Sequence, residues 1–336
     1  MANFSTTNIL ITGKQKNKEI QVLRAIAIIA VVLIHTAPTE GLYQVFIRPF
    51  INFSVPLFLF LSGYLTKSEN DNWPSFYKKR ITRIVIPYII WTVIYCLVKR
   101  GSIISAPRAI LTAGAAVPFY YIFVYVQLVL LTPLIGALAK SKYRSIGWLV
   151  APVSMLIFKY PPIFTGIEFS PSIDKIWSLC FLSHFTFYYL GMVLGNHIIE
   201  INYSYKKLLA LFSLSILLQM AEGFLWYQMD VPNLGTQCKI TALLTSSIFL
   251  LILSQLLRDK KITTNKTLQL LGDYSFGVYL IHPLLIFLLE EKQSLFPYTS
   301  IPFIINTAII IIICFLICHC GRLILGPKAS KWLGFI

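Results

Sequence analysis

Long apolar segments alternate with short polar ones along almost the whole chain. A helix needs about 20 mostly apolar residues to cross the ~30 Å hydrocarbon core of a bilayer, and ten segments reach or nearly reach that length. They are centred on residues 21–37, 46–66, 83–99, 118–138, 146–159, 177–198, 207–226, 240–257, 270–289 and 302–325. The fifth is the weakest, because Pro152 interrupts it. The pattern predicts an all-α, polytopic membrane helix bundle of about ten transmembrane helices, with both termini on one side because the number is even.

Composition supports this class: 57% of the 336 residues are hydrophobic, 12% are charged, and the mean hydropathy is +0.73. A net charge of +16 would suit nucleic acid if the basic residues shared one face. Instead they fall in short clusters between apolar segments, which indicates membrane topology. More of these clusters lie on the side of the N-terminus, so we expect both termini to be cytoplasmic. Membrane lipid is therefore an expected partner and nucleic acid is not.

No polar stretch is long enough for a second domain, so residues 1–336 are predicted to form one membrane domain with a polar cytoplasmic N-terminus over 1–19. The stretches 67–82 and 160–176 leave room for a short surface helix or an irregular lid. The cysteines lie mostly within apolar segments, where they serve as small core residues. We predict no metal site, because the group formed by Cys314, Cys318, His319 and Cys320 lacks an acidic or second Cys-x-x-Cys partner.

The first apolar segment carries two ionisable residues, Arg24 and His35, separated by ten uninterrupted apolar residues. On a helix, eleven positions turn through about 1100°, so both side chains lie on one face, roughly 16 Å apart. Ionisable groups within a membrane helix rarely face lipid, and this face is predicted to line a cavity. Taken singly, Arg24 is better explained as a residue that snorkels to the headgroups, and His35 as one hydrogen-bonded to a neighbouring helix; their shared face and the basic residues of the third segment favour a functional role.

The second and third segments add polar groups on the cytoplasmic side. Pro56 is expected to kink the second helix, and Ser62-Gly63 permits close helix packing or the approach of a ligand to the backbone. Arg80 and Arg83 are placed at the start of the third helix, on one side. Paired guanidinium groups at a helix N-terminus suit a polyphosphate; simple anchoring to the membrane surface is the alternative.

Four motifs in order resemble the acyltransferase-3 family of integral membrane acyltransferases. The first is the stretch Glu19-Ile20-Gln21-Val22-Leu23-Arg24 leading to His35, which matches the family's Arg-x10-His motif. The other three are Val55-Pro56-Leu57-Phe58 through Ser62-Gly63-Tyr64, Arg80-x-x-Arg83, and Leu271-Gly272-Asp273-Tyr274-Ser275-Phe276-Gly277-Val278-Tyr279-Leu280-Ile281-His282-Pro283. The resemblance spans nearly the whole chain.

The resemblance implies an O-acetyltransferase of the bacterial cytoplasmic membrane. Such enzymes move an acyl group, usually acetyl from cytoplasmic acetyl-CoA, to a hydroxyl of a surface carbohydrate such as a capsule, an exopolysaccharide or a lipid-linked precursor. The family's histidine falls on His35, its partner arginine on Arg24, and its Arg-x-x-Arg pair on Arg80 and Arg83. A neutral imidazole suits a general base for a sugar hydroxyl, so His35 is the predicted catalytic residue and the three arginines are predicted to hold the CoA phosphates.

One departure from the family pattern concerns the helix that ends at Thr132-Pro133. In many relatives this helix begins with a histidine, whereas here Tyr120 and Tyr121 stand in that region. If that histidine helps catalysis elsewhere, its role is either unfilled here or taken by one of these tyrosines. Further candidates are Ser62, Tyr279 and His282, the last of which is also explained as a structural residue before Pro283.

His184 and Glu222, within apolar segments, are expected either to bond another helix or to line the acceptor entrance. The competing function is a transporter or flippase of a lipid-linked sugar or acyl donor, because ten helices with buried ionisable residues also fit alternating access. The absence of an inverted repeat in the sequence and the use of the arginine pair for a cofactor favour the enzyme.

Overall fold

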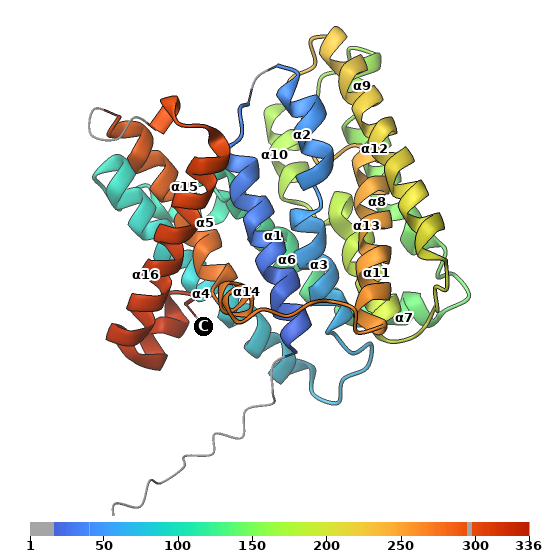
Figure 1. Cartoon of the computed structure of the whole chain (residues 1–336), viewed down its shortest axis with the longest axis horizontal. Coiled ribbons are helices and arrows are strands. Elements are labelled where there is room, and N and C mark those ends of the chain that lie inside the picture. The colour runs from blue at the N-terminus through green and yellow to red at the C-terminus, as the bar shows by residue number, and fades with distance from the viewer. Residues whose placement is uncertain (1–16, 40, 294–297, 336) are drawn as a thin grey trace, which may run out of the picture.

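The structure is a computed structural model, described over residues 17–39, 41–293 and 298–335 (Figure 1). Most of the polar N-terminus therefore lies outside the described residues. The described chain is helical and contains no strand. Eight helical spans in the described chain are long and apolar enough to cross a membrane, and three of them, Tyr43–Tyr64, Ile146–Phe164 and Pro171–Gly195, combine consecutive shorter elements. The number rises to ten if each of two bent helix pairs is one span. The prediction of an all-α polytopic bundle is confirmed, whereas the cytoplasmic location of the termini stays a prediction.

The first half of the chain supplies the centre of the bundle and part of each flank. Its elements are α1 (Lys18–Thr36), α2 (Tyr43–Ile51), α3 (Ser54–Tyr64), α4 (Trp73–Arg100), α5 (Ala106–Thr112), η1 (Val117–Phe119), α6 (Tyr120–Leu130), α7 (Thr132–Lys140), α8 (Ile146–Phe158) and α9 (Pro161–Phe164). Helix α1 contributes to two hydrophobic cores, one with α4, α6, α15 and α16 and the other with α3, α6, α8, α11 and α13. It is thus the central helix (Figure 1).

The second half completes both flanks. Its elements are α10 (Pro171–Leu179), η2 (Leu182–His184), α11 (Phe185–Gly195), α12 (Tyr205–Gln228), α13 (Ile240–Arg258), α14 (Lys266–Asp273), α15 (Ser275–Glu291), η3 (Tyr298–Ser300) and α16 (Phe303–Trp332). Large apolar side chains remain exposed on α8, α12 and α16, as expected for helices that face lipid. Both ends of the described chain lie at the lower end of the bundle in Figure 1.

Several predicted spans are broken where a single helix was expected. The segment 118–138 divides into α6 and α7 at Leu131, and α6 instead pairs with α5 across a bend of 57°. The segment 270–289 is interrupted at Tyr274, where α14 and α15 meet at 71°. The predicted kink at Pro56 is also wrong: the break lies earlier, at residues 52–53, and Pro56 sits in the first turn of α3, where its missing N–H breaks no helical bond.

The start of α4 corrects a second expectation. The Asn72 side chain accepts a hydrogen bond from the Ser75 backbone N–H at 3.0 Å, and Pro74 occupies the first turn. Both features are typical of a helix N-terminus. Arg80 and Arg83 consequently lie two to three turns inside α4, so the predicted contribution of a helix N-terminus to binding an anion there is wrong.

Helices α3 and α11 are in backbone contact at two glycines, where any residue with a Cβ atom would clash. A Cβ atom on Gly63 would lie 2.1 Å from the carbonyl oxygen of Tyr188, and one on Gly191 would lie 2.1 Å from that of Phe60. Small residues that permit such backbone contact are typical of membrane helix interfaces. Of the two uses suggested for Ser62-Gly63, close packing is therefore the one that Gly63 serves.

Replacing Gly191 by alanine is expected to destabilise the protein by about 1–3 kcal/mol or more, because the new methyl group meets a backbone carbonyl rather than a movable side chain. The thermal unfolding midpoint of the purified protein in detergent measures the effect. Ser213→Ala, a small change on the exposed side of α12, is the matched control. Equal midpoints for the two variants would show that α3 and α11 are not in backbone contact.

Candidate active site

A cavity of about 1180 Å³ opens at the end of the bundle where α3 leads into α4. It exceeds the roughly 300–1,000 Å³ that is usual for a small-molecule site. Its rim includes the loop from Leu65 to Asn72, and its inner part reaches Val31 on α1. Its lining includes Gln21, Arg24, Ser62, Lys79, Arg80, Arg83, Tyr121, Tyr125, Asn196, Ser275 and Tyr279. Six helices that are distant in sequence, α1, α3, α4, α6, α11 and α15, thus line one cavity.

Three of the predicted site residues, Arg24, Arg80 and Arg83, line this cavity together. One Nη atom of Arg80 donates to the Ser62 hydroxyl at 3.2 Å, and its Cζ lies 4.9 Å from the centre of the Phe76 ring. One Nη atom of Arg24 donates to the Gln21 side chain at 3.4 Å. Arg24 also interacts electrostatically with Arg83 and with Asp273. Like charges held this close in a partly buried site are well placed to bind a multiply charged anion.

The rim of the cavity carries acidic as well as basic groups. Glu69 and Asp71 line it beside Lys67. The side chain of Glu69 is hydrogen-bonded to Lys140, which lowers the pKa of the Glu69 carboxyl. Since Glu69 is turned toward Lys140, the arginines remain the charges nearest the inner part of the cavity.

Tyrosines form the inner end of the cavity. Tyr121 and Tyr279 both line it, with ring centroids 5.7 Å apart. The Tyr279 hydroxyl donates to the carbonyl oxygen of Pro118, so this ring is fixed between α15 and the start of α6. The Tyr279 ring also lies 6.2 Å from that of His282. Tyr279 therefore separates the cavity from a buried imidazole.

His35 and His282 form a pair beyond this end, with ring centroids 5.4 Å apart. His35 lies one helical turn beyond Val31, the deepest α1 residue of the cavity lining, and is not itself among the lining residues. The side chain lies well inside the protein and keeps some accessible surface. Its imidazole makes no hydrogen bond to any residue that the structure describes. No described residue therefore occupies the hydrogen-bonding positions of the imidazole nitrogens.

His282 is fully buried, and its Nδ1 lies 3.1 Å from the Val278 carbonyl oxygen. A carbonyl can only accept, so Nδ1 is the donor and Nε2 carries the lone pair of the neutral ring. Within the described part of the chain, Nε2 has no hydrogen-bond partner. A buried, unpaired polar atom is unusual in a native structure, and here it stands beside the predicted general base.

Tyr120 and Tyr121 are adjacent in sequence but face different regions. Tyr121 lines the cavity, whereas the Tyr120 ring lies 5.7 Å from the ring of His184 and interacts electrostatically with Arg48. His184 is bonded to the Ser183 hydroxyl at 2.8 Å. Ser62, Tyr121 and Tyr279 thus line the same cavity as the arginines. Tyr120 instead lies near His184 and Arg48, in the half of the bundle away from that cavity, which we call the far half.

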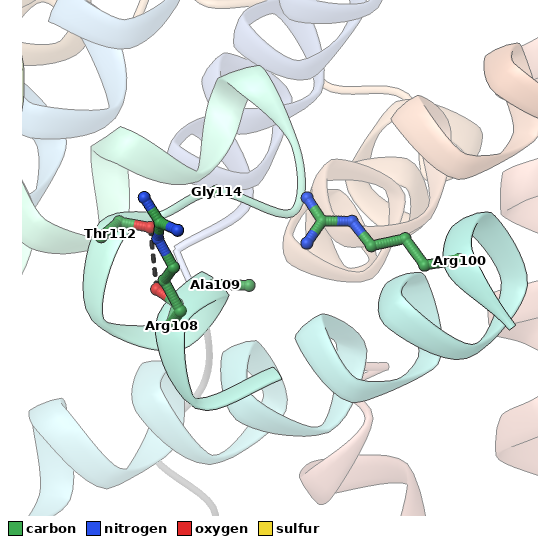
Figure 2. A pocket seen from close by; sticks show the side chains of 5 residues that line it. All are labelled: Arg100, Arg108, Ala109, Thr112 and Gly114. Atoms are coloured by element: carbon green, nitrogen blue, oxygen red, sulfur yellow. Dashed lines mark hydrogen bonds between the residues drawn. The ribbon is translucent and has the colours of Figure 1, made fainter. Parts of the chain in front are cut away.

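A second, smaller cavity of about 280 Å³ lies at the other end of α4, lined by Arg100, Arg108, Ala109, Thr112 and Gly114. Figure 2 shows the Arg100 and Arg108 side chains reaching into it from α4 and α5. The Thr112 hydroxyl is already used, since it donates to the Arg108 carbonyl oxygen at 2.8 Å. The lining holds two guanidinium groups but no histidine, carboxylate, lysine, cysteine or tyrosine, which are the side chains that commonly act as general acids and bases.

Sequence reasoning did not single out Tyr125 and Asn196 of the large cavity, or Arg48 in the far half. The Asn196 side chain joins two segments, because it accepts from the Ser68 backbone N–H at 2.9 Å and donates to the Thr66 carbonyl oxygen at 2.8 Å. A lone polar residue at the end of an apolar segment gives little signal in a sequence. Arg48, in contrast, is a charged residue within an apolar segment and could have been found by the reasoning applied to Arg24.

Comparison with known proteins agrees with the resemblance found in the motifs. No curated protein and no solved structure matched the chain. The family described as an acyltransferase domain, acyltransferase-3, matches residues 17–320, which is nearly the whole chain. The protein therefore belongs to the acyltransferase-3 family and is a membrane acyltransferase.

Proposed function

We propose that this protein is an O-acetyltransferase that takes acetyl from acetyl-CoA on the cytoplasmic side and transfers it to a hydroxyl of a cell-surface carbohydrate or its lipid-linked precursor. The observation that supports the donor is the convergence of Arg24, Arg80 and Arg83 on one cavity at the end of the bundle where both ends of the described chain lie. Guanidinium groups bind phosphate through paired hydrogen bonds. A CoA molecule carries several phosphates and a long neutral arm that ends in the thioester.

The shape of the cavity suits such a donor. Its charged groups lie toward the opening, and its inner end is aromatic, with Tyr121 and Tyr279. The phosphates would stay with the arginines while the neutral arm extends along α1 toward Val31. A thioester that reached Val31 would then lie about one helical turn, roughly 5.4 Å along the axis, from His35.

His35 is the group that we propose as the general base. It removes the proton of the acceptor hydroxyl as the oxygen attacks the thioester carbonyl, and the C–S bond then breaks to release CoA as its thiolate. The proton returns from the imidazole to that thiolate or to water, which restores neutral His35. The arginines take no part in making or breaking bonds. They hold the thioester beside the base, which removes the entropic cost of bringing the two groups together in the transition state.

Replacing Arg80 by alanine is expected to weaken acetyl-CoA binding by about tenfold or more, since one charge-assisted hydrogen bond contributes about 1.5–3 kcal/mol. Radiolabelled acetyl-CoA binding to the purified full-length protein in detergent measures the loss. Arg83→Ala should behave alike. Lys142→Ala removes an exposed charge that does not line the cavity and serves as the control. Unchanged binding in both arginine variants would remove acetyl-CoA from this cavity.

A further inference from the structure

The half of the bundle opposite the arginine cavity contains a second group of charges, which the proposed donor does not use. Three charged residues each interact electrostatically with Lys239, at the start of α13: Arg48 of α2, Lys159 after α8 and Glu222 of α12. Arg48 also interacts with His35. We name these four residues the distal charge cluster. Through Arg48, this cluster interacts with His35, the predicted general base, on the side opposite the proposed donor cavity.

Lys239 is the most deeply buried member, with only 2% of its surface exposed. Its ammonium lies 4.5 Å from the centre of the Trp226 ring and makes no ion pair or hydrogen bond within the described residues. It also stands at the N-terminus of a 19-residue helix, whose dipole disfavours a cation. This buried ammonium thus has an aromatic ring beside it but, among the described residues, no hydrogen-bonded anion of the kind that proteins normally supply.

Glu222 does not supply that partner. Its two carboxylate oxygens accept hydrogen bonds from the hydroxyls of Tyr160 and Thr241. The Tyr160 oxygen in turn accepts from the Ile240 backbone N–H at 3.0 Å. Glu222 is therefore held in a hydroxyl network that joins α12 to α13, and it is the one carboxylate among three cations in this cluster.

Arg48 extends the positive charge toward His35. Its Nε donates to the Asn52 side chain at 3.0 Å and to the Gly235 carbonyl oxygen at 2.8 Å, which fixes the guanidinium under the loop before α13. Its two Nη groups make no hydrogen bond to any described residue, and the side chain keeps partly exposed surface. These groups remain available to an anion.

From this unmatched charge we infer that the acceptor is an anionic carbohydrate, whose carboxylate or phosphate group binds between Arg48 and Lys239 while its hydroxyl meets His35. This inference rests on the proposed function and adds the charge class of the acceptor. A neutral sugar would leave the Lys239 ammonium without a partner, whereas an anion on the sugar would pair with it. Both a uronic acid and a sugar phosphate have the required chemistry.

Calorimetric titration of the full-length protein in detergent with glucuronic acid, glucose 6-phosphate and glucose tests the inference. We expect at least one charged sugar to bind tenfold or more tightly than glucose, and the better of the two identifies the anion. In Lys239→Met this preference should disappear, whereas Lys175→Met, which removes an exposed lysine of α10, should keep it. Equal binding of all three sugars, or a preference that survives in Lys239→Met, would overturn the inference.

Two further measurements make the result unambiguous. Binding of a charged sugar in the arginine cavity would be lost in Arg80→Ala and kept in Lys239→Met, which is the reverse of the expected pattern. Acetyl-CoA binding should be unchanged in Lys239→Met. If acetyl-CoA binds normally and the sugar preference is absent, the inference fails while the proposed function stands.

The preference should also depend on pH. Burial lowers the pKa of Lys239 to about 8, with Lys159 and Arg48 acting in the same direction and Glu222 against them. The ammonium is then roughly 90% charged at pH 7 and roughly 10% charged at pH 9. Repeating the titration at pH 9 should reduce the preference for the charged sugar several-fold, and an unchanged preference would contradict a role for Lys239.

Discussion

Replacing His35 by asparagine is expected to abolish acetyl transfer while leaving acetyl-CoA binding intact. The variant removes the imidazole that takes the proton from the acceptor hydroxyl in our proposal, and general base catalysis is commonly worth about 10²–10⁴ in rate. Binding should persist because His35 is not among the residues that line the arginine cavity. Radiolabelled acetyl transfer and acetyl-CoA binding, measured on the same membranes at equal protein level, separate the two effects.

His197 provides a matched control for this experiment. It is exposed in a turn after α11 and has a φ of 54°, a conformation that asparagine tolerates well. His197→Asn should therefore transfer acetyl at the normal rate. If His35→Asn kept a comparable rate, His35 would lose its assigned role and the base would have to be sought elsewhere in the bundle.

The second large effect is expected at His282. Its Nε2 is buried without a partner in the described structure, and its ring lies 5.4 Å from that of His35. We expect His282→Asn to lower the transfer rate by about 10²-fold, because the His282 ring lies beside that of His35 and its unpaired Nε2 adds a hydrogen-bond acceptor next to the base. Folding should change little, since its one hydrogen bond is to the Val278 carbonyl oxygen of its own helix.

A double-variant comparison shows whether the two imidazoles act together. If they do, His35→Asn combined with His282→Asn will transfer no more slowly than the worse single variant, as is usual for residues that act as a unit. Losses that multiply would indicate independent roles. A normal rate in His282→Asn alone would reduce this histidine to a packing residue.

The apolar pattern predicted the helical class and most of the spans because a bilayer demands long apolar segments whatever their tertiary contacts. The positions of the breaks were harder to obtain. The break at Leu131 does have a local signal, because Pro133 stands in the first turn of α7. The 71° bend at Tyr274 has no proline at the bend and no comparable signal in the apolar pattern.

The site was predictable in part. Placing Arg24 on a cavity-facing side of α1 required only helix geometry, and the motif order added Arg80 and Arg83. The helix start assigned to those arginines was wrong although Asn72 and Pro74 gave a signal for the true start. Two other features depend on how helices rotate and pack: the separation of Tyr120 from Tyr121, and the meeting of His35 with a histidine from α15. Neither could be read from spacing within one segment.

The backbone contact of α3 with α11 limits how this protein can move. Two helices that touch through Gly63 and Gly191 cannot slide past one another without a carbonyl colliding with a Cα atom. The part of the cavity wall that ends in Ser62 and Asn196 is therefore fixed, and any movement that widens the cavity must come from its other walls, which include α4 and the 65–72 loop. We expect a chemical cross-link from α3 to α11 to leave turnover unchanged, whereas a cross-link from α3 to α4 would slow a turnover that depends on movement of α4.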